Sequence, residues 1–93
     1  MQEPLVYQLY FTKTALKDIK KLDAITIKRI RAKLDYFTSQ PNPLALAKQL
    51  QNHTDAQYRY RIGNYRILFD VDGDKIVVLR IDKRSDIYRM FVL

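Results

Sequence analysis

Apolar and polar residues alternate on both sides of a Gly63-Asn64 pair, along residues 57–69, except that the apolar Leu68 stands at a polar position. The apolar positions are Tyr58, Tyr60, Ile62, Tyr65, Ile67 and Phe69. This pattern predicts a β-hairpin with a two-residue loop, in which Ile62 faces Tyr65 and Arg61 faces Arg66. Further from the loop, Tyr60 faces Ile67 and Tyr58 faces Phe69. The apolar side chains then share one face of the sheet, and Arg59, Arg61 and Arg66 share the other.

A short strand and two helices are predicted before this hairpin. Residues 5–11 are apolar and aromatic, as in a strand, and Thr12 is a candidate N-cap for a helix that follows. A turn near Asp23 separates this helix from a second one, which ends at Gln40-Pro41 because proline cannot continue a helix. The helical stripes are Ala15, Leu16, Ile19 and Leu22 in the first helix and Ile27, Ile30, Leu34 and Phe37 in the second.

The remaining segments complete an α+β domain. Residues 44–54 form either a helical turn or a loop, and Asp72-Gly73-Asp74 is a second hairpin signal. Residues 75–81 are an apolar, central strand whose faces depend on whether that loop has two or three residues. Residues 82–93 are expected to leave the sheet through a short helical turn. We therefore predict the order β-α-α-β-β-β over one domain, residues 1–93, with two N-terminal helices on one face of a mainly antiparallel four-stranded sheet. The helices should cover the face with the aromatic side chains and leave the face with Arg59, Arg61 and Arg66 open to solvent.

The charge of the chain favours an anionic partner. There are 17 Lys and Arg against 10 Asp and Glu, a net charge of +7. Nucleic acid or an acidic protein is favoured over a membrane surface, although many small basic proteins are simply soluble. No signal peptide or membrane span is apparent, so we expect the protein in the cytoplasm.

Arginine and tyrosine supply the candidate chemistry. Arg59, Arg61 and Arg66 form either a phosphate cradle or a solvated sheet face, and their clustering on adjacent strands favours the cradle. In the basic run of residues 83–89, a helical turn would place Arg84 and Tyr88 on one side. Tyr88 then either stacks on a base or transfers a proton, or it packs the C-terminus. The helix lysines, from Lys13 to Lys33, solubilise the surface or extend a footprint for RNA.

The sequence argues against a metal or cofactor site. Cysteine is absent, and His53 is the one histidine, in a polar segment. Asp70, Asp72 and Asp74 resemble the start of a calcium loop, but no glutamate follows at the twelfth position. No P-loop, dinucleotide fingerprint or serine triad is visible. We expect neither a cofactor nor a metal.

Three segments together resemble the RelE/ParE superfamily of bacterial and archaeal toxins, and most closely its RelE branch. They are FTKTALKDIKKL, RYRIGNYRILF and IVVLRIDKRSDIYR, of which the GNYR turn and the KR-x-x-x-Y ending are the most specific. The resemblance implies two helices on a twisted antiparallel sheet. It also implies an endoribonuclease that cleaves the mRNA codon in the ribosomal A site and is held by an acidic antitoxin.

The resemblance further implies roles for individual residues. Arg66 corresponds to the arginine that stabilises charge on the scissile phosphate, and Arg84 to the basic residue beside it. Tyr88 corresponds to the tyrosine that stacks on the base and acts as general base. The family's basic strand residues are Arg59 and Arg61 here, and we count Arg61 among the catalytic residues. Arg59, with Lys83 and Arg89, is assigned to RNA binding.

Two departures bear on the mechanism and the function. Lys83-Arg84 stands where other subgroups have histidine-arginine, and the one glutamate is Glu3, so a histidine-based mechanism is not expected. The ParE branch shares the fold but is associated with inhibition of DNA gyrase. The alternatives to an mRNA endoribonuclease are therefore a ParE-like gyrase inhibitor or a non-catalytic basic module that binds an acidic partner.

Overall fold

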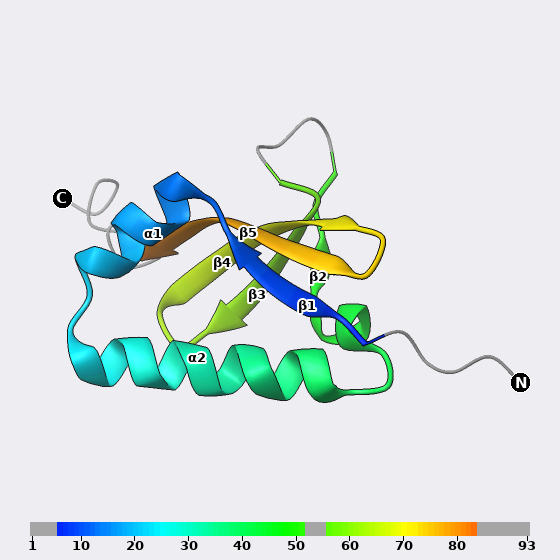
Figure 1. Cartoon of the computed structure of the whole chain (residues 1–93), viewed down its shortest axis with the longest axis horizontal. Coiled ribbons are helices and arrows are strands. Elements are labelled where there is room, and N and C mark those ends of the chain that lie inside the picture. Colours follow the sequence, from blue (N-terminus) through cyan, green and yellow to red (C-terminus); the bar gives the residue numbers. More distant parts are fainter. Residues whose placement is uncertain (1–5, 52–55, 84–93) are drawn as a thin grey trace, which may run out of the picture.

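A mixed sheet with two helices makes up the computed structural model, which describes residues 6–51 and 56–83 (Figure 1). The elements are β1 (Gln8–Phe11), α1 (Lys13–Lys20), α2 (Ala24–Ser39), the 3-10 helix η1 (Pro43–Leu46), β2 (Lys48–Gln49), β3 (Tyr58–Ile62), β4 (Tyr65–Asp72) and β5 (Lys75–Lys83). The strand order is β1-β5-β4-β3-β2. The α+β class and the two N-terminal helices are confirmed.

The sheet differs from the predicted one at its edges. It has five strands, because the segment left open between a helical turn and a loop forms η1 and then the short strand β2. β2 pairs antiparallel with β3, with Lys48 opposite Arg59. At the other edge β1 pairs parallel with β5, so the sheet is mixed. Two residues of β2 are too few to show an alternating pattern in the sequence, which explains why this strand was not predicted.

The β3–β4 hairpin has the predicted register. Arg61 lies opposite Arg66, and Ile62 lies opposite Tyr65 at the loop. Gly63 has a φ of +57°, a left-handed conformation that a residue without a Cβ adopts at little cost. The loop therefore determines the register, and the register determines which side chains reach the core.

The loop between β4 and β5 has two residues, which settles the question that the sequence left open, and a bulge in β5 then changes the register further along. Near the loop Asp72 pairs with Lys75, but the register shifts by one residue between Leu68 and Phe69. After the shift Leu68 faces Arg80 and Arg66 faces Asp82. The expectation that residues 82–93 leave the sheet is wrong for the first two, since β5 continues to Lys83. The bulge keeps this later part of the strand in phase with β4.

Side-chain caps begin both helices. The Thr12 hydroxyl accepts a hydrogen bond from the Ala15 N–H at 3.1 Å, as predicted, and donates one to the Leu79 carbonyl oxygen at 3.1 Å. Asp23 accepts from the Thr26 N–H at 2.7 Å, and this bond to the backbone lowers the pKa of the Asp23 carboxyl. The cap of α1 thus also fastens the helix to β5.

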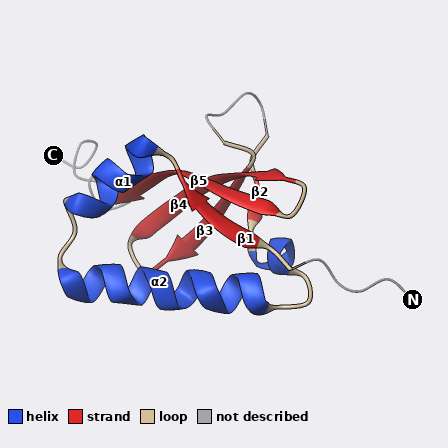
Figure 2. Cartoon of the chain, viewed as in Figure 1, coloured by secondary structure: helices blue, strands red, loops and turns tan. Residues whose placement is uncertain are grey.

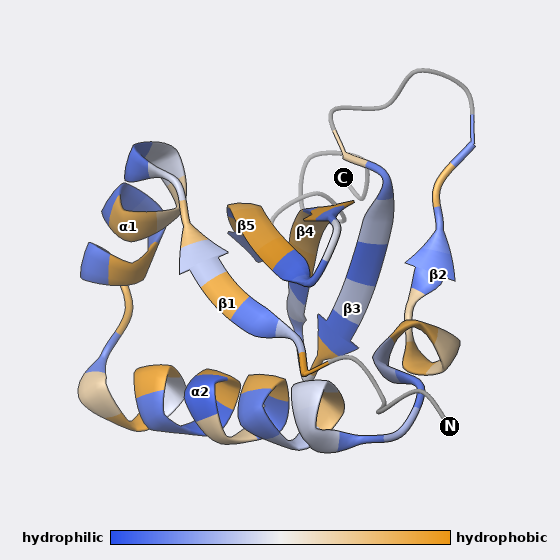
Figure 3. Cartoon of the chain, turned by 45° about the vertical axis from the view of Figure 1, so that its right-hand side comes forward, coloured by the Kyte–Doolittle hydropathy of each residue, from blue (hydrophilic) through white to orange (hydrophobic). Residues whose placement is uncertain are grey.

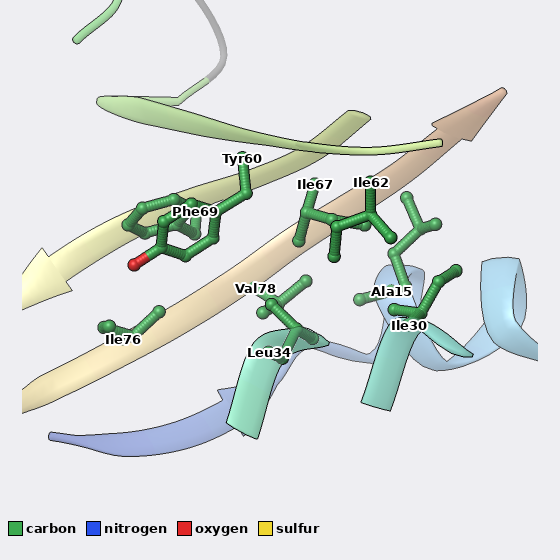
Figure 4. Packing of buried hydrophobic residues seen from close by; sticks show 10 residues of the cluster. Ala15, Ile30, Leu34, Tyr60, Ile62, Ile67, Phe69, Ile76 and Val78 are labelled. Carbon is green, nitrogen blue, oxygen red and sulfur yellow. The ribbon is translucent and has the colours of Figure 1, made fainter. Parts of the chain in front are cut away.

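The helices and the sheet enclose an aromatic and aliphatic core, with α2 running along the sheet and α1 beside the end of β5 (Figure 2). The largest fully buried side chains are Tyr60, Phe69, Leu34, Ile67, Ile76 and Val78. Figure 4 shows Leu34 and Ile30 of α2 pointing toward the side chains of the sheet. The rings of Tyr60 and Phe69 stack with centroids 4.5 Å apart. The predicted aromatic face is confirmed as the core face.

Replacing Thr12 by alanine should lower the free energy of unfolding by about 1–2 kcal/mol, because one hydroxyl makes both the cap and the bond to β5. Urea denaturation measures this change. Thr14→Ala is the matched control, since Thr14 is exposed in the same helix turn. A loss in the control as large as in Thr12→Ala would contradict the double role.

Tyr60 should make the fold sensitive to alkaline pH. Burial raises the pKa of its phenol to about 12, with a smaller contribution from Tyr7, and the hydroxyl donates to the Pro43 carbonyl oxygen at 3.0 Å. Because the folded-state pKa is raised, the stability due to the neutral phenol is complete below the ordinary value of about 10 and is lost as the pH rises toward 12. Thermal melts between these values should show a smaller decline for Tyr60→Phe, which cannot ionise. An unchanged decline would contradict the assignment to Tyr60.

Candidate functional site

Basic residues of neighbouring strands gather on the face of the sheet opposite the core. Cross-strand partners share a face, so Arg61 lies beside Arg66, and Arg59 and Arg80 flank Leu68 in the next row. Figure 3 shows the arginines of β3 as blue bands along the strand. We call this set, Arg59, Arg61, Arg66 and Arg80, the arginine face. An anion meeting this surface would find several guanidinium groups at once.

The members of the arginine face differ in exposure. Arg61 is exposed as predicted, whereas Arg59 and Arg66 are half-buried, so the face is less open than expected. The Arg66 side chain is 26% exposed, and its Nε is buried with no hydrogen-bond partner within the described part of the chain. A buried donor without an acceptor costs free energy, so Arg66 is not placed in the way that best stabilises the fold.

A carboxylate that was not predicted from the sequence lies next to Arg66. Asp82 is its cross-strand partner on β5, with Asp82 Oδ2 3.7 Å from Arg66 Nη2. The row therefore reads Arg61, Arg66, Asp82 across three strands. The sequence could not show which face of the sheet Asp82 lies on, because the bulge determines how the later residues of β5 face. Arg66 thus has a cation on one side and an anion on the other.

A buried carboxylate of α1 continues this chain of charges. Asp18 Oδ2 accepts hydrogen bonds from Arg80 Nε and from the Ile81 N–H, each at 3.0 Å. Arg80 Nη2 lies 3.7 Å from Asp82 Oδ1. Alternating charges therefore run Asp18, Arg80, Asp82, Arg66, from the first helix to the arginine face. Only 10% of the Asp18 side chain is exposed, so the Asp18–Arg80 pair is the most firmly fixed part of this series of charges.

Two pockets lie near these elements and differ in chemistry. A polar groove of about 320 Å³ lies where α1 meets the ends of β4 and β5. It is lined by Asp18, Lys21, Leu22, Tyr65, Arg80, Ile81, Asp82 and Lys83. An apolar pocket of about 240 Å³ between α1 and α2 is lined by residues such as Leu16, Ile19 and Ile27. Of these two pockets, the polar groove adjoins the alternating charges, and its lining combines lysine, arginine and phenol groups with the carboxylates of Asp18 and Asp82.

The predicted site residues divide into two groups. Arg59, Arg61, Arg66 and Lys83 lie in the described strands, and the first three share the arginine face as expected. Lys83 ends β5 opposite Tyr65 and lines the polar groove. The predicted positions Arg84, Tyr88 and Arg89 lie outside the described residues. Sequence reasoning missed Arg80 and Asp82, which the register of β5 brings to the site.

Over residues 6–51 and 56–83, neither helix has the length and apolar character needed to cross a bilayer.

Comparison with known proteins agrees with the fold and with the motifs. A family model described as the ParE toxin of the type II toxin-antitoxin system parDE matches residues 9–88. The chain is 34% identical to toxin RelE3 of Methanocaldococcus jannaschii, covering 90% of this chain and 98% of that protein. It is 32% identical to toxin RelG of Mycobacterium tuberculosis, covering 89% and 97% respectively.

A solved structure is also similar over nearly its full length. The RelB-RelE antitoxin-toxin complex from Methanococcus jannaschii contains a chain that aligns with a TM-score of 0.65 and 30% identity. The alignment covers 89% of this chain and 99% of that one. The family match, the relatives and the fold agree, and the resemblance inferred from the motifs is confirmed: the chain belongs to the RelE/ParE family and is a RelE-like toxin of a type II toxin–antitoxin system.

Proposed function

We propose that this toxin is an endoribonuclease that cuts mRNA in the ribosomal A site and so stops translation. The observation that supports it best is the placement of Arg66 between Arg61 and Asp82 on a face opposite the core. Rigid strands hold a guanidinium there that matches the oxygens of a phosphodiester. The proposed setting is the cytoplasm, and the proposed catalytic domain is the whole chain, residues 1–93.

The chemistry needs few protein groups, since RNA supplies its own nucleophile. The 2′-hydroxyl attacks the adjacent phosphorus, the 5′-oxygen of the next nucleotide leaves, and the phosphate becomes more negative in the transition state. Arg66, assisted by Arg61, stabilises that charge, and Arg84 adds a second cation beside it. Because the Arg66 Nε has no hydrogen-bond partner among residues 6–51 and 56–83, a small rearrangement of its side chain toward a phosphate would gain a hydrogen bond. No metal or cofactor is part of this proposal.

Proton transfer is the step that arginine serves poorly. A guanidinium hardly titrates, so we assign the general base to Tyr88, which also stacks on the nucleobase. Arg59, Lys83 and Arg89 bind the flanking RNA backbone. An enzyme with this set of groups is slow on free RNA and depends on the ribosome to hold the codon in line for attack. That is why we propose mRNA bound in the ribosome as the substrate.

An acidic antitoxin is the proposed protein partner. The similar solved structure is a complex of a RelE chain with a RelB antitoxin, and this chain has a net charge of +7. A partner that covers the arginine face would block the approach of RNA and neutralise the charge. A segment of the antitoxin that orders on binding would suit this role.

Inhibition of DNA gyrase is the second candidate function, because the matching family model is that of the ParE toxin. A non-catalytic basic module that binds an acidic partner is the third. Either would leave mRNA intact. The tyrosine and arginines matched by the RelE-type motif favour cleavage.

Replacing Arg66 by alanine should lower the rate of mRNA cleavage by roughly 100- to 1000-fold, the usual effect of removing one charge-stabilising donor. The measurement is primer extension on an mRNA translated in vitro, with and without ribosomes. Arg31→Ala is the matched control, since Arg31 is exposed on α2 and pairs with Asp35 at 3.6 Å. Thermal melts of both variants check that the fold is retained.

Full cleavage or toxicity in Arg66→Ala would overturn the assignment of this residue. Cuts that persist at full rate in Tyr88→Phe would remove Tyr88 as the base. Intact mRNA with the unaltered toxin, followed by inhibition in a gyrase supercoiling assay, would establish the second function instead.

A further inference from the structure

The position next to Arg66 is already occupied by an anion of the protein itself. Asp82 stands directly across from Arg66 on β5, as Arg61 does on β3. Cross-strand partners approach closely, so the carboxylate sits where the arginine face would otherwise present unbalanced charge. A substrate phosphate that binds Arg66 must share or take this place.

We propose that the Asp82 carboxylate occupies the phosphate subsite of the free toxin and that RNA binds by displacing it from Arg66. This inference rests on the proposed role of Arg66 as the phosphate-binding arginine. It assigns Asp82 and Arg80 to an ion-pair exchange: Arg66 passes from carboxylate to phosphate, and Arg80 keeps the carboxylate.

The contact between Asp82 and Arg66 is loose enough to be exchanged. The distance of 3.7 Å from Asp82 Oδ2 to Arg66 Nη2 exceeds that of a hydrogen bond. A charge-assisted bond from an arginine to a phosphate oxygen is about 2.7–2.9 Å long and stronger. The side chains of Arg66 and Asp82 are 26% and 32% exposed, so the pair is partly accessible to an incoming ligand.

The displaced carboxylate already has another cation. The two oxygens of Asp82 serve different arginines, Oδ2 facing Arg66 and Oδ1 facing Arg80 at 3.7 Å. Arg80 is held in place by Asp18 through the 3.0 Å bond to Nε. A small rotation of Asp82 toward Arg80 would therefore release Arg66 without leaving either carboxylate uncompensated.

A purely structural role for Asp82 makes the opposite prediction. If the carboxylate only relieves the repulsion between Arg61 and Arg66, its removal lowers stability and leaves RNA affinity unchanged or lower. If it competes with phosphate, its removal lowers stability slightly but strengthens RNA binding. The sign of the change in affinity separates the two roles.

The test is equilibrium binding of the full-length toxin to a short single-stranded RNA whose riboses are 2′-O-methylated, followed by fluorescence anisotropy. This probe lacks the nucleophile, so binding is measured without cleavage. Asp82→Asn should bind roughly threefold to fivefold more tightly than the unaltered toxin, the scale of a partly exposed ion pair. Asp72→Asn, the same charge change at an exposed position at the far end of β4, should bind nearly as the unaltered toxin does.

A second comparison tests whether Asp82 acts through Arg66. In the Arg66→Gln background, Asp82→Asn should add no more affinity than Asp72→Asn does. The proposal is overturned if Asp82→Asn binds no more tightly than the unaltered toxin, if Asp72→Asn gains as much, or if the gain persists without Arg66. A gain in binding by a toxin that cuts no mRNA would refute the proposed nuclease function and leave the exchange at Arg66 supported.

Discussion

The buried carboxylate of Asp18 is the contact on which the relation between helix and sheet depends. β1 covers β5 only as far as the pair Phe11 and Val78, so within the described residues the later part of β5 is paired with β4 on one side and has no strand on the other. Asp18 accepts from the Ile81 N–H and from Arg80 at once, which satisfies a buried amide and fixes a guanidinium. Together with the Thr12 hydroxyl, this contact fixes α1 against β5, and it begins the series of alternating charges that leads to Arg66.

Because of its bulge, β5 contributes side chains both to the core and to the charged face of the sheet. Before it, Ile76 and Val78 point into the core, and after it Ile81 does so as well, although the spacing from Val78 to Ile81 is odd. The extra residue restores the alternation with β4 and sends Arg80 and Asp82 to the opposite face. Core packing and the charge pattern of the site thus depend on a single irregularity.

The sequence predicted the elements whose signals are local. The hairpin register followed from Gly63-Asn64 and from an alternation that only Leu68 breaks, and the α1 cap followed from Thr12. From these, the arrangement of Arg59, Arg61 and Arg66 was also predictable. The partner of Arg66 was not, because a one-residue shift in β5 exchanges its faces, and nothing in an apolar run such as residues 75–81 reveals the shift. β2 was missed since two residues show no period.

The length of the edge strands has a consequence for the behaviour of the protein in concentrated solution. β5, the longest strand with nine residues, lies inside the sheet, while the edges are the four residues of β1 and the two of β2. Beyond β1, Thr12 and Asp18 occupy backbone groups of β5 that would otherwise be open. An apolar strand with an open edge is a template for another chain, so this arrangement protects the toxin against edge-to-edge aggregation.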